Sequence, residues 1–339
     1  MLEKNELSAR EYFAVLEDIK KCIKNSHYRV MTSANVERNI LYWNIGNVIL
    51  EYSSWGNKFV ENLSKDLRIE YPNATGYTVR NLNYMKQFAI RVRDEKILHQ
   101  VGAKISWKAI KLLIDKTDTV EEHIWYTMQC ISNGWSSSVL VHQIESNLYE
   151  RQALAVKTTN FKQQLWNPLG EQVEEIIKDP YIFDFIPNAG NLKELELEEA
   201  LVQQITKLLL EFGSGFAFMG RQYPLKVGEK EFFVDLLFYN VKLHCYFVVE
   251  LKTVEFEPEF AGKLSFYLSA IDGELKSESD NPTIGLLLCK GKDKLVAEYA
   301  LKDVNKPMGI SNYKLSNQIS DDLQKNLPTI EDIKNRIHF

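Results

Sequence analysis

The stretch Phe232–Asp272 reads FFVDLLFYNVKLHCYFVVELKTVEFEPEFAGKLSFYLSAID, and it decides the fold. Its first half holds two strongly apolar runs, Phe232–Asn240 and Leu243–Leu251, separated by Val241–Lys242. Runs of this kind are typical of strands covered on both faces, and the short connection predicts a hairpin. Charges are rarely buried without a partner, because removing water from each costs several kcal/mol. Asp235 and Glu250 nevertheless lie inside these runs, and Lys252 directly follows the second.

These three side chains predict a hydrolytic site that uses a divalent cation. Glu250 and Lys252 are two residues apart, so on a strand both point to the same face, while Asp235 comes from the neighbouring strand. Two carboxylates suit Mg²⁺ or Mn²⁺, whose bound waters can become nucleophiles. A lysine suits the negative charge that develops on a phosphate. A plain salt bridge between Glu250 and Lys252, with Asp235 starting a turn, is the alternative that these residues leave open.

The spacing of Asp235, Glu250 and Lys252 and their position on predicted strands resemble the D…ExK core of the PD-(D/E)XK nuclease superfamily. The surrounding sequence motifs resemble those of its bacterial YhcG-like family. In this half the resemblance is carried by Gly213–Gly220 (GSGFAFMG), Arg221–Tyr223 (RQY), Val234–Phe238 (VDLLF), Val249–Lys252 (VELK), Pro258–Gly262 (PEFAG), Phe266–Leu268 (FYL) and Asn281–Lys290 (NPTIGLLLCK). In the first half it is carried by YWNIGNVILEY, LSKDL, RNLNYMKQF, ISWKAIKLL, ISNGWSSSVLVHQI and LYERQ. The resemblance implies a helical N-terminal domain followed by a restriction-endonuclease-like αβββαβ domain, and so an α/β protein.

The resemblance also implies an activity and further site residues. The activity is a Mg²⁺- or Mn²⁺-dependent endonuclease, with DNA favoured over RNA, in a bacterial setting of restriction, defence or mobile elements. Members of the superfamily supply an acid from the first helix, and Glu198 is the better candidate here because Glu199 points away from the apolar face. A rim glutamate that faces water is the alternative. Arg221 either clamps a phosphate or pairs with a neighbouring acid.

Lys263 and Tyr267 lie four residues apart on the next helix, where family members usually read Gln-x-x-x-Tyr. Lys replaces Gln here, which puts a full positive charge without an acceptor beside the predicted metal. Lys263 and Tyr267 are therefore expected to contact substrate. The same replacement favours a second hypothesis, a catalytically inactive nuclease-fold module that binds nucleic acid or a protein partner.

Domain boundaries follow from composition and from the element pattern. The 339 residues are long enough for two domains, and a net charge of −5 argues against a protein that coats nucleic acid indiscriminately. The expected parts are a helical domain at 1–151, bridging helices and a linker at 152–194, a nuclease-like domain at 195–327 and a tail at 328–339. Pro187–Asn191 (PNAGN) has the clearest linker composition.

Helices are expected throughout the first part, and strands mainly in the third. The helices expected in the first part start at Ser8 (to Asn25), Asn35 (to Ser53), Phe59, Thr78, Ser106, Asp118 and Ser136 (to Arg151). For the nuclease-like part we expect helices at Leu195–Phe212, Glu259–Ile271 and Leu295–Leu301, and further strands at Phe216–Val227, Thr283–Lys290 and Met308–Leu315.

The segment Tyr77–Lys116 is strongly basic, with nine Lys or Arg residues against three Asp or Glu. It predicts a surface that contacts phosphates, for which Arg80, Arg91 and Arg93 are the candidates. An ordinary solvated helical face is the alternative.

The sequence also indicates a compartment. It shows no signal peptide and no run of 18 apolar residues, and its four cysteines are scattered without a C-x-x-C pair. We therefore expect reduced thiols, a cytoplasmic location and no membrane segment. A homo-oligomer and a restriction or defence partner both stay open.

Overall fold

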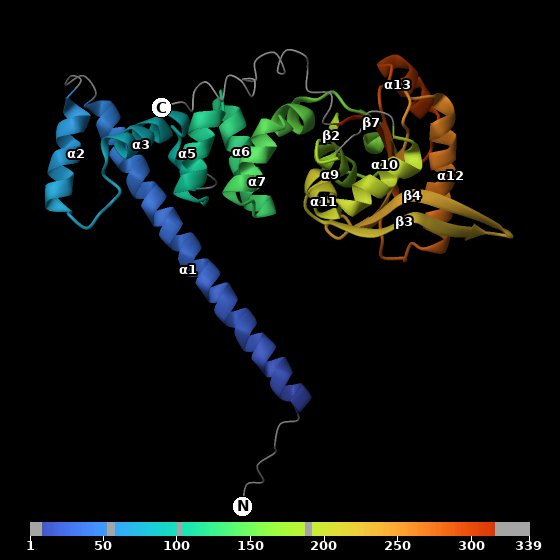
Figure 1. The fold of residues 1–339 in the computed structure, drawn as a ribbon, viewed down its shortest axis with the longest axis horizontal. Helices are drawn as coiled ribbons and strands as arrows, with labels where there is room; N and C mark the ends of the chain where they lie inside the picture. The colour runs from blue at the N-terminus through green and yellow to red at the C-terminus, as the bar shows by residue number, and fades with distance from the viewer. Residues whose placement is uncertain (1–8, 53–57, 100–103, 187–191, 316–339) are drawn as a thin grey trace, which may run out of the picture. The chain divides into compact units, whose positions relative to one another are not determined.

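The computed structural model describes residues 9–52, 58–99, 104–186 and 192–315 (Figure 1). The chain divides into two compact units, Met1–Glu145 and Ser146–Phe339. The predicted linker Pro187–Asn191 and the predicted tail at 328–339 lie outside the described residues.

The first unit is helical throughout its described part, as the sequence predicts. Its helices are α1 (Ala9–Glu51), α2 (Phe59–Glu70), α3 (Val79–Arg91), α4 (Glu95–Ile97), α5 (Trp107–Lys116), α6 (Val120–Asn133) and α7 (Ser137–Glu145). The predicted starts of α3 and α5 are confirmed, because the side chains of Thr78 and Ser106 accept hydrogen bonds from backbone N–H groups in the first turn. Gly134, with φ of 63° in the left-handed region that favours glycine, ends α6.

The expectation of two helices before residue 53 is wrong, since α1 is continuous from Ala9 to Glu51. The stretch between the two expected helices holds no Pro and no Gly, so nothing in it has to end a helix. Further along, α1 packs closely against α3. At that crossing Gly46 lies so near α3 that an added Cβ would be 2.1 Å from the carbonyl oxygen of Met85.

The residues that the sequence analysis assigns to a bridge contribute two short strands to the second unit. They form a π-helical turn η3 (Tyr149–Leu154), β1 (Thr158–Thr159), α8 (Phe161–Gln164), α9 (Leu169–Ile176) and β2 (Tyr181–Phe183). β1 and β2 both pair with β7 (Met308–Leu315). A buried ion pair between Arg151 and Glu211 also joins this segment to the rest of the unit.

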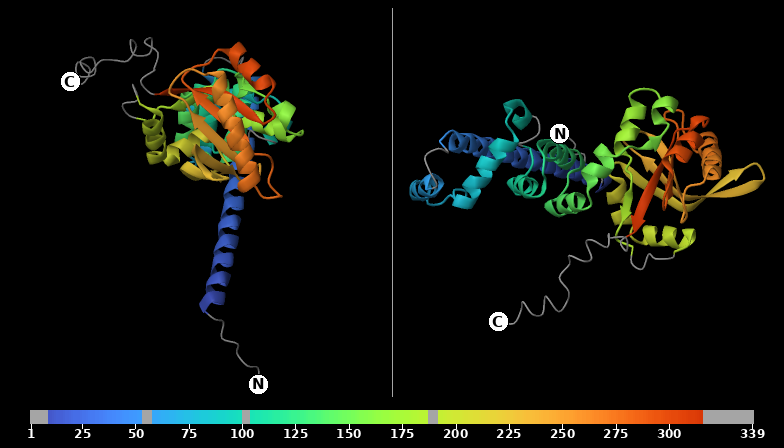
Figure 2. Two further views of the ribbon diagram at one scale, coloured as in Figure 1. Left: turned by 90° about the vertical axis from the view of Figure 1, so that its right-hand side faces the viewer. Right: turned by 90° about the horizontal axis from the view of Figure 1, so that it is seen from above.

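The second unit is built on one mixed sheet with the order β1-β7-β6-β5-β4-β3, to which β2 is added beside β7. The other strands are β3 (Phe216–Val227), β4 (Lys230–Asn240), β5 (Cys245–Leu251) and β6 (Ile284–Cys289). β3, β4 and β5 pair antiparallel, and β5, β6 and β7 pair parallel. The ribbon of β3 and β4 extends beyond the rest of the sheet in both Figure 1 and Figure 2.

Helices cover both faces of this sheet, which explains the continuous apolar runs that the sequence shows. α10 (Glu194–Gln203) and α11 (Ile205–Phe212) pack on one face, together with residues such as Phe238 and Val249. α12 (Pro258–Glu274) and α13 (Lys294–Lys302) pack on the other face, against Val248 and Leu287 among others. Figure 2 shows α12 lying across the sheet. The αβββαβ order predicted for this domain is therefore confirmed.

Two local expectations in this unit are wrong. The single helix expected at Leu195–Phe212 is two helices, which meet at Gln204 without a Gly or Pro to signal the break. The hairpin turn spans residues 241–244 rather than two residues. Asn240 holds it, because its side-chain oxygen accepts the N–H groups of Lys242 and Leu243, and His244 has a φ of 48°. A two-residue turn of the usual hairpin type needs Gly or Asn in its centre, and neither is present.

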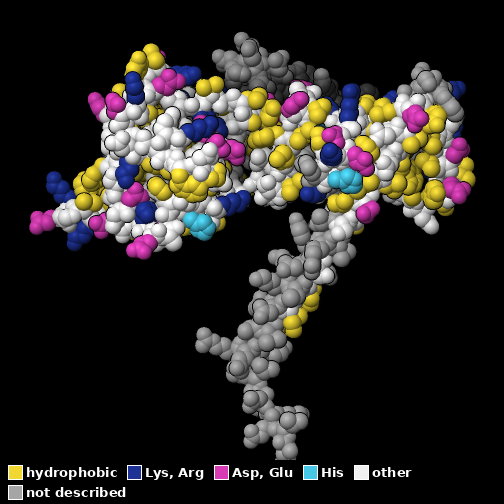
Figure 3. All heavy atoms as spheres, turned by 180° about the vertical axis from the view of Figure 1, so that it is seen from behind, with side chains coloured by type: hydrophobic (Ala, Val, Ile, Leu, Met, Phe, Trp, Pro, Cys, Tyr) yellow, Lys and Arg dark blue, Asp and Glu magenta, His cyan; other side chains and the backbone are white. Residues whose placement is uncertain are grey.

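On the face shown in Figure 3, Lys and Arg side chains are interspersed with Asp and Glu. Within the described part of the chain, no helix combines the length and the apolar character that crossing a membrane requires.

Candidate active site

Seven ionisable or polar side chains meet at one end of the sheet of the second unit. They come from α10, β3, β4, α12 and the end of β5, and they are Glu194, Glu198, Gln222, Asp235, Glu250 and Lys263, with Lys252 directly after β5. The predicted triplet of Asp235, Glu250 and Lys252 is part of this group, and each of the three is at most 6 % exposed.

The backbone explains how Asp235 reaches the group. The pairing of β4 with β5 ends with Leu236 opposite Val249, so the adjacent residues Asp235 and Glu250 lie just beyond the last pair. Beyond that point the Asp235 carboxylate accepts the backbone N–H of Leu251 at 2.9 Å. The side chain of Asp235 thus takes the place of a backbone acceptor and is held against β5.

The Glu250 carboxylate is the point on which the two ammonium groups of the site converge. Its Oε1 lies 3.1 Å from Nζ of Lys252 and also contacts Nζ of Lys263. Its Oε2 is buried and has no hydrogen-bond partner among the described residues. A buried carboxylate oxygen without a partner is costly, so it is a position where a cation or a donor would be stabilised.

The side-chain amide of Gln222 links two acids. Nε2 of Gln222 donates to Glu198 Oε2 at 2.7 Å and lies 3.5 Å from Asp235 Oδ1. Gln222 stands on β3 between the paired residues Arg221 and Tyr223, and its φ of 45° is in the left-handed region. A non-glycine residue there stores strain, and such residues cluster at functional sites.

The charges in the site perturb one another. Burial, followed by the charges of Glu250 and Glu198, raises the pKa of Asp235 to about 7 against the opposing effects of the Leu251 N–H and Lys252. Burial also raises the pKa of Glu198. For Lys252 burial lowers the pKa, but Glu250, Glu194 and Asp235 outweigh it, so its pKa is raised. Lys252 is therefore an ammonium ion at neutral pH.

The donor set suits a divalent cation held by few protein ligands. Four carboxyl groups, those of Glu194, Glu198, Asp235 and Glu250, face only two ammonium groups, those of Lys252 and Lys263. When ionised they leave an excess of two negative charges. In the described residues, no three His, Cys, Asp or Glu side chains are grouped tightly enough to hold a metal by themselves. Mg²⁺ commonly uses one or two carboxylates and keeps waters, which the pair of Asp235 and Glu250 can provide.

Other predicted site residues lie beside this group or in the other unit. Arg221 lies 3.9 Å from Glu199, the pairing that the sequence left as its alternative role. Tyr267 is buried on α12, with Nζ of Lys263 located 5.3 Å from the centre of its ring. In the helical unit, Arg91 donates to the carbonyl oxygen of Thr117 at 2.7 Å, while Arg93 is exposed. Arg80 lines a pocket that is described below.

Sequence reasoning missed two members of the group. Glu194 accepts a hydrogen bond from Nζ of Lys252 at 3.0 Å, although it looks like an ordinary acid at the start of a helix. Gln222 lies within the motif RQY at Arg221–Tyr223 and carries no local sign of a role in the site. The register of the β3–β4 hairpin, which places Gln222 opposite Asp235, is the signal that could have identified it.

Comparisons with known proteins agree with the fold of both units. Residues 174–328 match the YhcG PDDEXK nuclease domain, and residues 18–151 match the DUF1016 N-terminal domain. The Escherichia coli K12 protein named "Putative nuclease YhcG" is 27% identical over 366 residues, covering 95% of this chain and 96% of that protein.

Two solved structures show a limited likeness. A repair endonuclease from Pyrococcus abyssi is 16% identical with a TM-score of 0.26, covering 38% of this chain and 49% of that one. A complex of EndoMS with double-stranded DNA is 18% identical with a TM-score of 0.26, covering 38% and 47%. Likenesses of this size carry no argument about substrate. The two domain matches and the Escherichia coli relative of similar length show the family of this chain. It belongs to the YhcG-like family of the PD-(D/E)XK nuclease superfamily, with its helical N-terminal domain.

Proposed function

We propose that this protein is a Mg²⁺- or Mn²⁺-dependent endonuclease that hydrolyses phosphodiester bonds in DNA. The observation that carries the proposal is the convergence of Asp235, Glu250 and Lys252, all buried, at the point where β4 and β5 separate. Keeping three charged groups there is costly unless the site binds a cation and an anionic substrate. DNA is preferred over RNA because of the resemblance to restriction-endonuclease-like proteins.

In this proposal Asp235 and Glu250 hold the metal, and Glu198 adds negative charge from α10. Glu198 is kept in place by the amide of Gln222, which also faces Asp235. The bound cation supplies a water of lowered pKa and neutralises charge on the phosphate. The orphaned Oε2 of Glu250 is the protein atom with most to gain from such a ligand.

The two lysines serve the substrate rather than the water. Because the pKa of Lys252 is raised, its ammonium group can donate hydrogen bonds to a phosphate oxygen but cannot accept a proton near neutral pH. It is held 3.0 Å from Glu194 and 3.1 Å from Glu250, so its position is fixed before substrate arrives. Lys263 is about half exposed and provides a second ammonium group at the rim. Arg221 and Tyr267 border the same region and would contact the strand.

The test is incubation of the full chain with supercoiled plasmid in the presence of Mg²⁺, Mn²⁺ or EDTA, alongside Asp235→Asn and Lys252→Met. We expect nicking with either metal, none with EDTA, and a loss of at least a hundredfold in both variants. Asp303→Asn, an exposed acid after α13, is the control and should cut normally. Cleavage that persists in both site variants would refute the assignment. A single-stranded RNA tested in parallel decides between the two nucleic acids.

One observation favours a second candidate, a non-catalytic module that binds nucleic acid or a protein partner. The ammonium group of Lys263 already contacts Glu250, so the protein carries a cation of its own beside the proposed metal ligands. Binding of DNA without cleavage in every metal, by the unchanged chain and by Lys263→Gln, would establish this candidate in place of the enzyme. The proposed setting, in the cytoplasm of a bacterium and in restriction, defence or mobile-element biology, is the same for both.

A further inference from the structure

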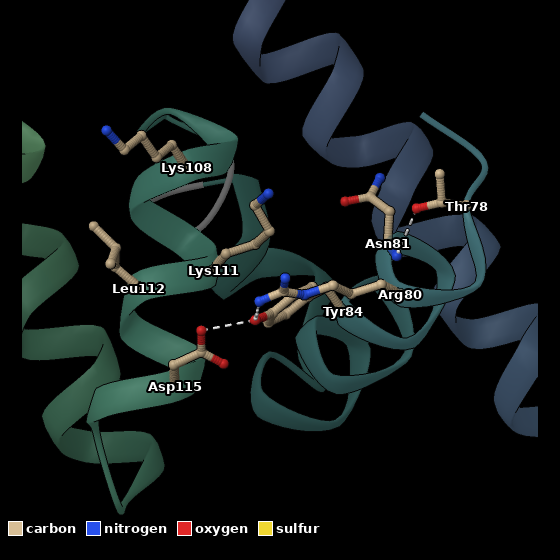
Figure 4. A pocket seen from close by; sticks show the side chains of 8 residues that line it. All are labelled: Thr78, Arg80, Asn81, Tyr84, Lys108, Lys111, Leu112 and Asp115. Carbon is tan, nitrogen blue, oxygen red and sulfur yellow. Dashed lines mark hydrogen bonds between the residues drawn. The ribbon is translucent and has the colours of Figure 1, made fainter. Parts of the chain in front are cut away.

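A separate pocket lies in the helical unit between α3 and α5. Its volume is about 300 Å³, and Arg80, Tyr84, Lys108, Lys111 and Asp115 are among its lining residues. Figure 4 shows Arg80 extending from α3 towards α5 across Tyr84, while Lys108 and Lys111 come from α5. The pocket is therefore built from two helices whose relative position is fixed by the core of this unit, including the buried residues Phe88 and Ile110.

The pocket contains an excess of positive charge that the protein does not neutralise. None of Arg80, Lys108 and Lys111 forms an ion pair within 4.0 Å in the part of the chain that the structure describes. The one acid in the pocket, Asp115, accepts a hydrogen bond from the hydroxyl of Tyr84 at 2.7 Å. Asp115 is thus hydrogen-bonded to a neutral donor, and the three cations of the pocket exceed this one acid by two charges.

Arg80 is arranged in the way that suits an anion. Its guanidinium lies 5.7 Å from the centre of the Tyr84 ring and donates a long hydrogen bond of 3.4 Å to the Tyr84 hydroxyl. A guanidinium placed over a ring keeps its in-plane N–H donors available for two oxygens of one phosphate. Nζ of Lys111 also lies 5.6 Å from the centre of the same ring. Tyr84 therefore orders two cations at once.

The side-chain amide of Asn81 lines the pocket but is not free to recognise a base. Its Nδ2 donates to the carbonyl oxygen of Gly76, and its Oδ1 accepts from the indole of Trp107. With both ends engaged, it has little capacity left for a base edge. The pocket consequently offers charge and an apolar surface at Leu112, without a hydrogen-bonding pattern specific for one base.

We propose that this pocket binds a backbone phosphate of a nucleic acid strand, with the attached sugar against Leu112 and the ring of Tyr84. The identity of the macromolecule rests on the proposed nuclease function, and the site itself rests on the three unpaired cations. The contact is independent of sequence, because phosphate contacts position a strand while base contacts specify it. It gives the helical unit a fixed point of attachment to the substrate.

The experiment measures binding of a 20-base-pair fluorescent duplex by the full chain in EDTA, between 50 and 200 mM KCl. The pocket variant is R80Q/K111Q, and the matched control is K65Q/R68Q, which removes two exposed cations of α2 outside the pocket. We expect the pocket variant to bind about tenfold more weakly and the slope of log K against log salt to become less steep by about one, since one phosphate contact is lost. The control should keep a slope near that of the unchanged protein. Equal losses in the two variants would overturn the proposal.

A second variant changes the pocket without changing its charge. Tyr84→Phe keeps the ring but removes the hydroxyl that occupies Asp115, so the carboxylate becomes free to pair with Arg80 or Lys111. We expect a fall in duplex affinity of about threefold with unchanged circular dichroism, and unchanged affinity would contradict the arrangement. Tight binding of inorganic phosphate together with an unaltered duplex slope would show a site for the free anion only, which also overturns the proposal.

The two proposals fail separately. Binding is measured without a divalent cation, so it does not depend on cleavage. A pocket-dependent slope in a protein that never cuts plasmid would retain the phosphate site and reject the nuclease. Cleavage with an unchanged slope in R80Q/K111Q would do the reverse.

Discussion

Among single residues, Lys263 makes the most testable difference to the proposed metal site. Its ammonium group shares Glu250 Oε1 with Lys252, so a metal ion has to compete with it for this carboxylate. We predict that Lys263→Gln binds Mn²⁺ about tenfold more tightly, equivalent to about 1.4 kcal/mol, a value discounted for the exposure of Lys263. Titration calorimetry of the full chain measures this directly.

The control for Lys263 is Lys294→Gln, which removes an exposed lysine of α13 that pairs with Glu298. Its Mn²⁺ affinity should equal that of the unchanged protein. If Lys263→Gln also leaves the affinity unchanged, then Lys263 does not compete with the metal for Glu250.

The raised pKa of Asp235 predicts a stability gain from its removal. In the folded protein this carboxyl keeps its proton up to a pKa of about 7, whereas in the unfolded chain it ionises near its ordinary value of 3.8. The unfolded state therefore binds fewer protons between these two pH values, so stability falls as pH rises from about 4 to about 7 and is then constant. Without metal at pH 8, Asp235→Asn should be more stable by about 2 to 4 kcal/mol.

Urea denaturation in EDTA at pH 5 and pH 8 tests this prediction. The difference between Asp235→Asn and the unchanged protein should be larger at pH 8, while Asp303→Asn should show no such dependence. A variant that is destabilised equally at both pH values would mean that the carboxylate contributes more through its bond to the Leu251 N–H than it costs through burial.

The sequence predicted which side chains would meet wherever the alternation of a β-strand sets the direction in which they point. Glu250 and Lys252 are two apart at a strand end, so their meeting at 3.1 Å follows from the pleat. The position of Gln222 depends on a positive φ that the sequence does not signal at a glutamine, and that of Glu194 depends on how α10 lies over the sheet. The roles assigned to all of these residues stay predictions.

At the scale of elements, the crossing of α1 and α3 depends on Gly46. An added Cβ would lie 2.1 Å and 2.6 Å from the carbonyl oxygen and carbon of Met85, which are backbone atoms that cannot move aside alone. We predict that Gly46→Ala destabilises the helical unit by about 2 to 3 kcal/mol, because the two helices must separate. Urea denaturation followed by circular dichroism at 222 nm measures the loss.

Gly262 on α12 provides the matched comparison, since an added Cβ there would meet nothing within 4 Å. Gly262→Ala should therefore be neutral or stabilising by up to about 1 kcal/mol, as expected for alanine in place of glycine within a helix. Similar effects of the two substitutions would show that the α1–α3 contact is less close than described.

Elements with a local chemical signal were predictable, and those set by distant packing were not. Thr78 and Ser106 cap helices through their own side chains, so they mark the starts of α3 and α5 in the sequence. β1 and β2 are two and three residues long, and they form because β7 offers a free edge. No local pattern of so few residues could show this.

For the whole molecule, the division into two units has a consequence for unfolding. Met1–Glu145 and Ser146–Phe339 are each compact, and the second has apolar clusters on both faces of its sheet. We predict two calorimetric transitions, of which Gly46→Ala lowers one and Asp235→Asn, in EDTA at pH 8, raises the other. A single transition that responds to both substitutions would show that the units unfold together.

The fold class could be predicted for the whole chain because short sequence motifs that resemble those of the family occur in both halves. The boundary between the two domains was harder to predict. Arg151 lies in a segment expected to end the helical domain, yet it forms a buried ion pair with Glu211 of the second unit. An ion pair between residues sixty positions apart leaves no trace in local composition.

The replacement of a backbone acceptor by the Asp235 carboxylate ties the proposed chemistry to the order of folding. The amide of Lys252 is bound by the carbonyl oxygen of Leu288, so the lysine is not fixed until β6 has joined β5. A chain still emerging from the ribosome has the β4–β5 pair, with Asp235 held against Leu251, before it has the strand that orders the backbone of Lys252. In the proposed nuclease, Lys252 would therefore take its place only after β6 had been added to the sheet.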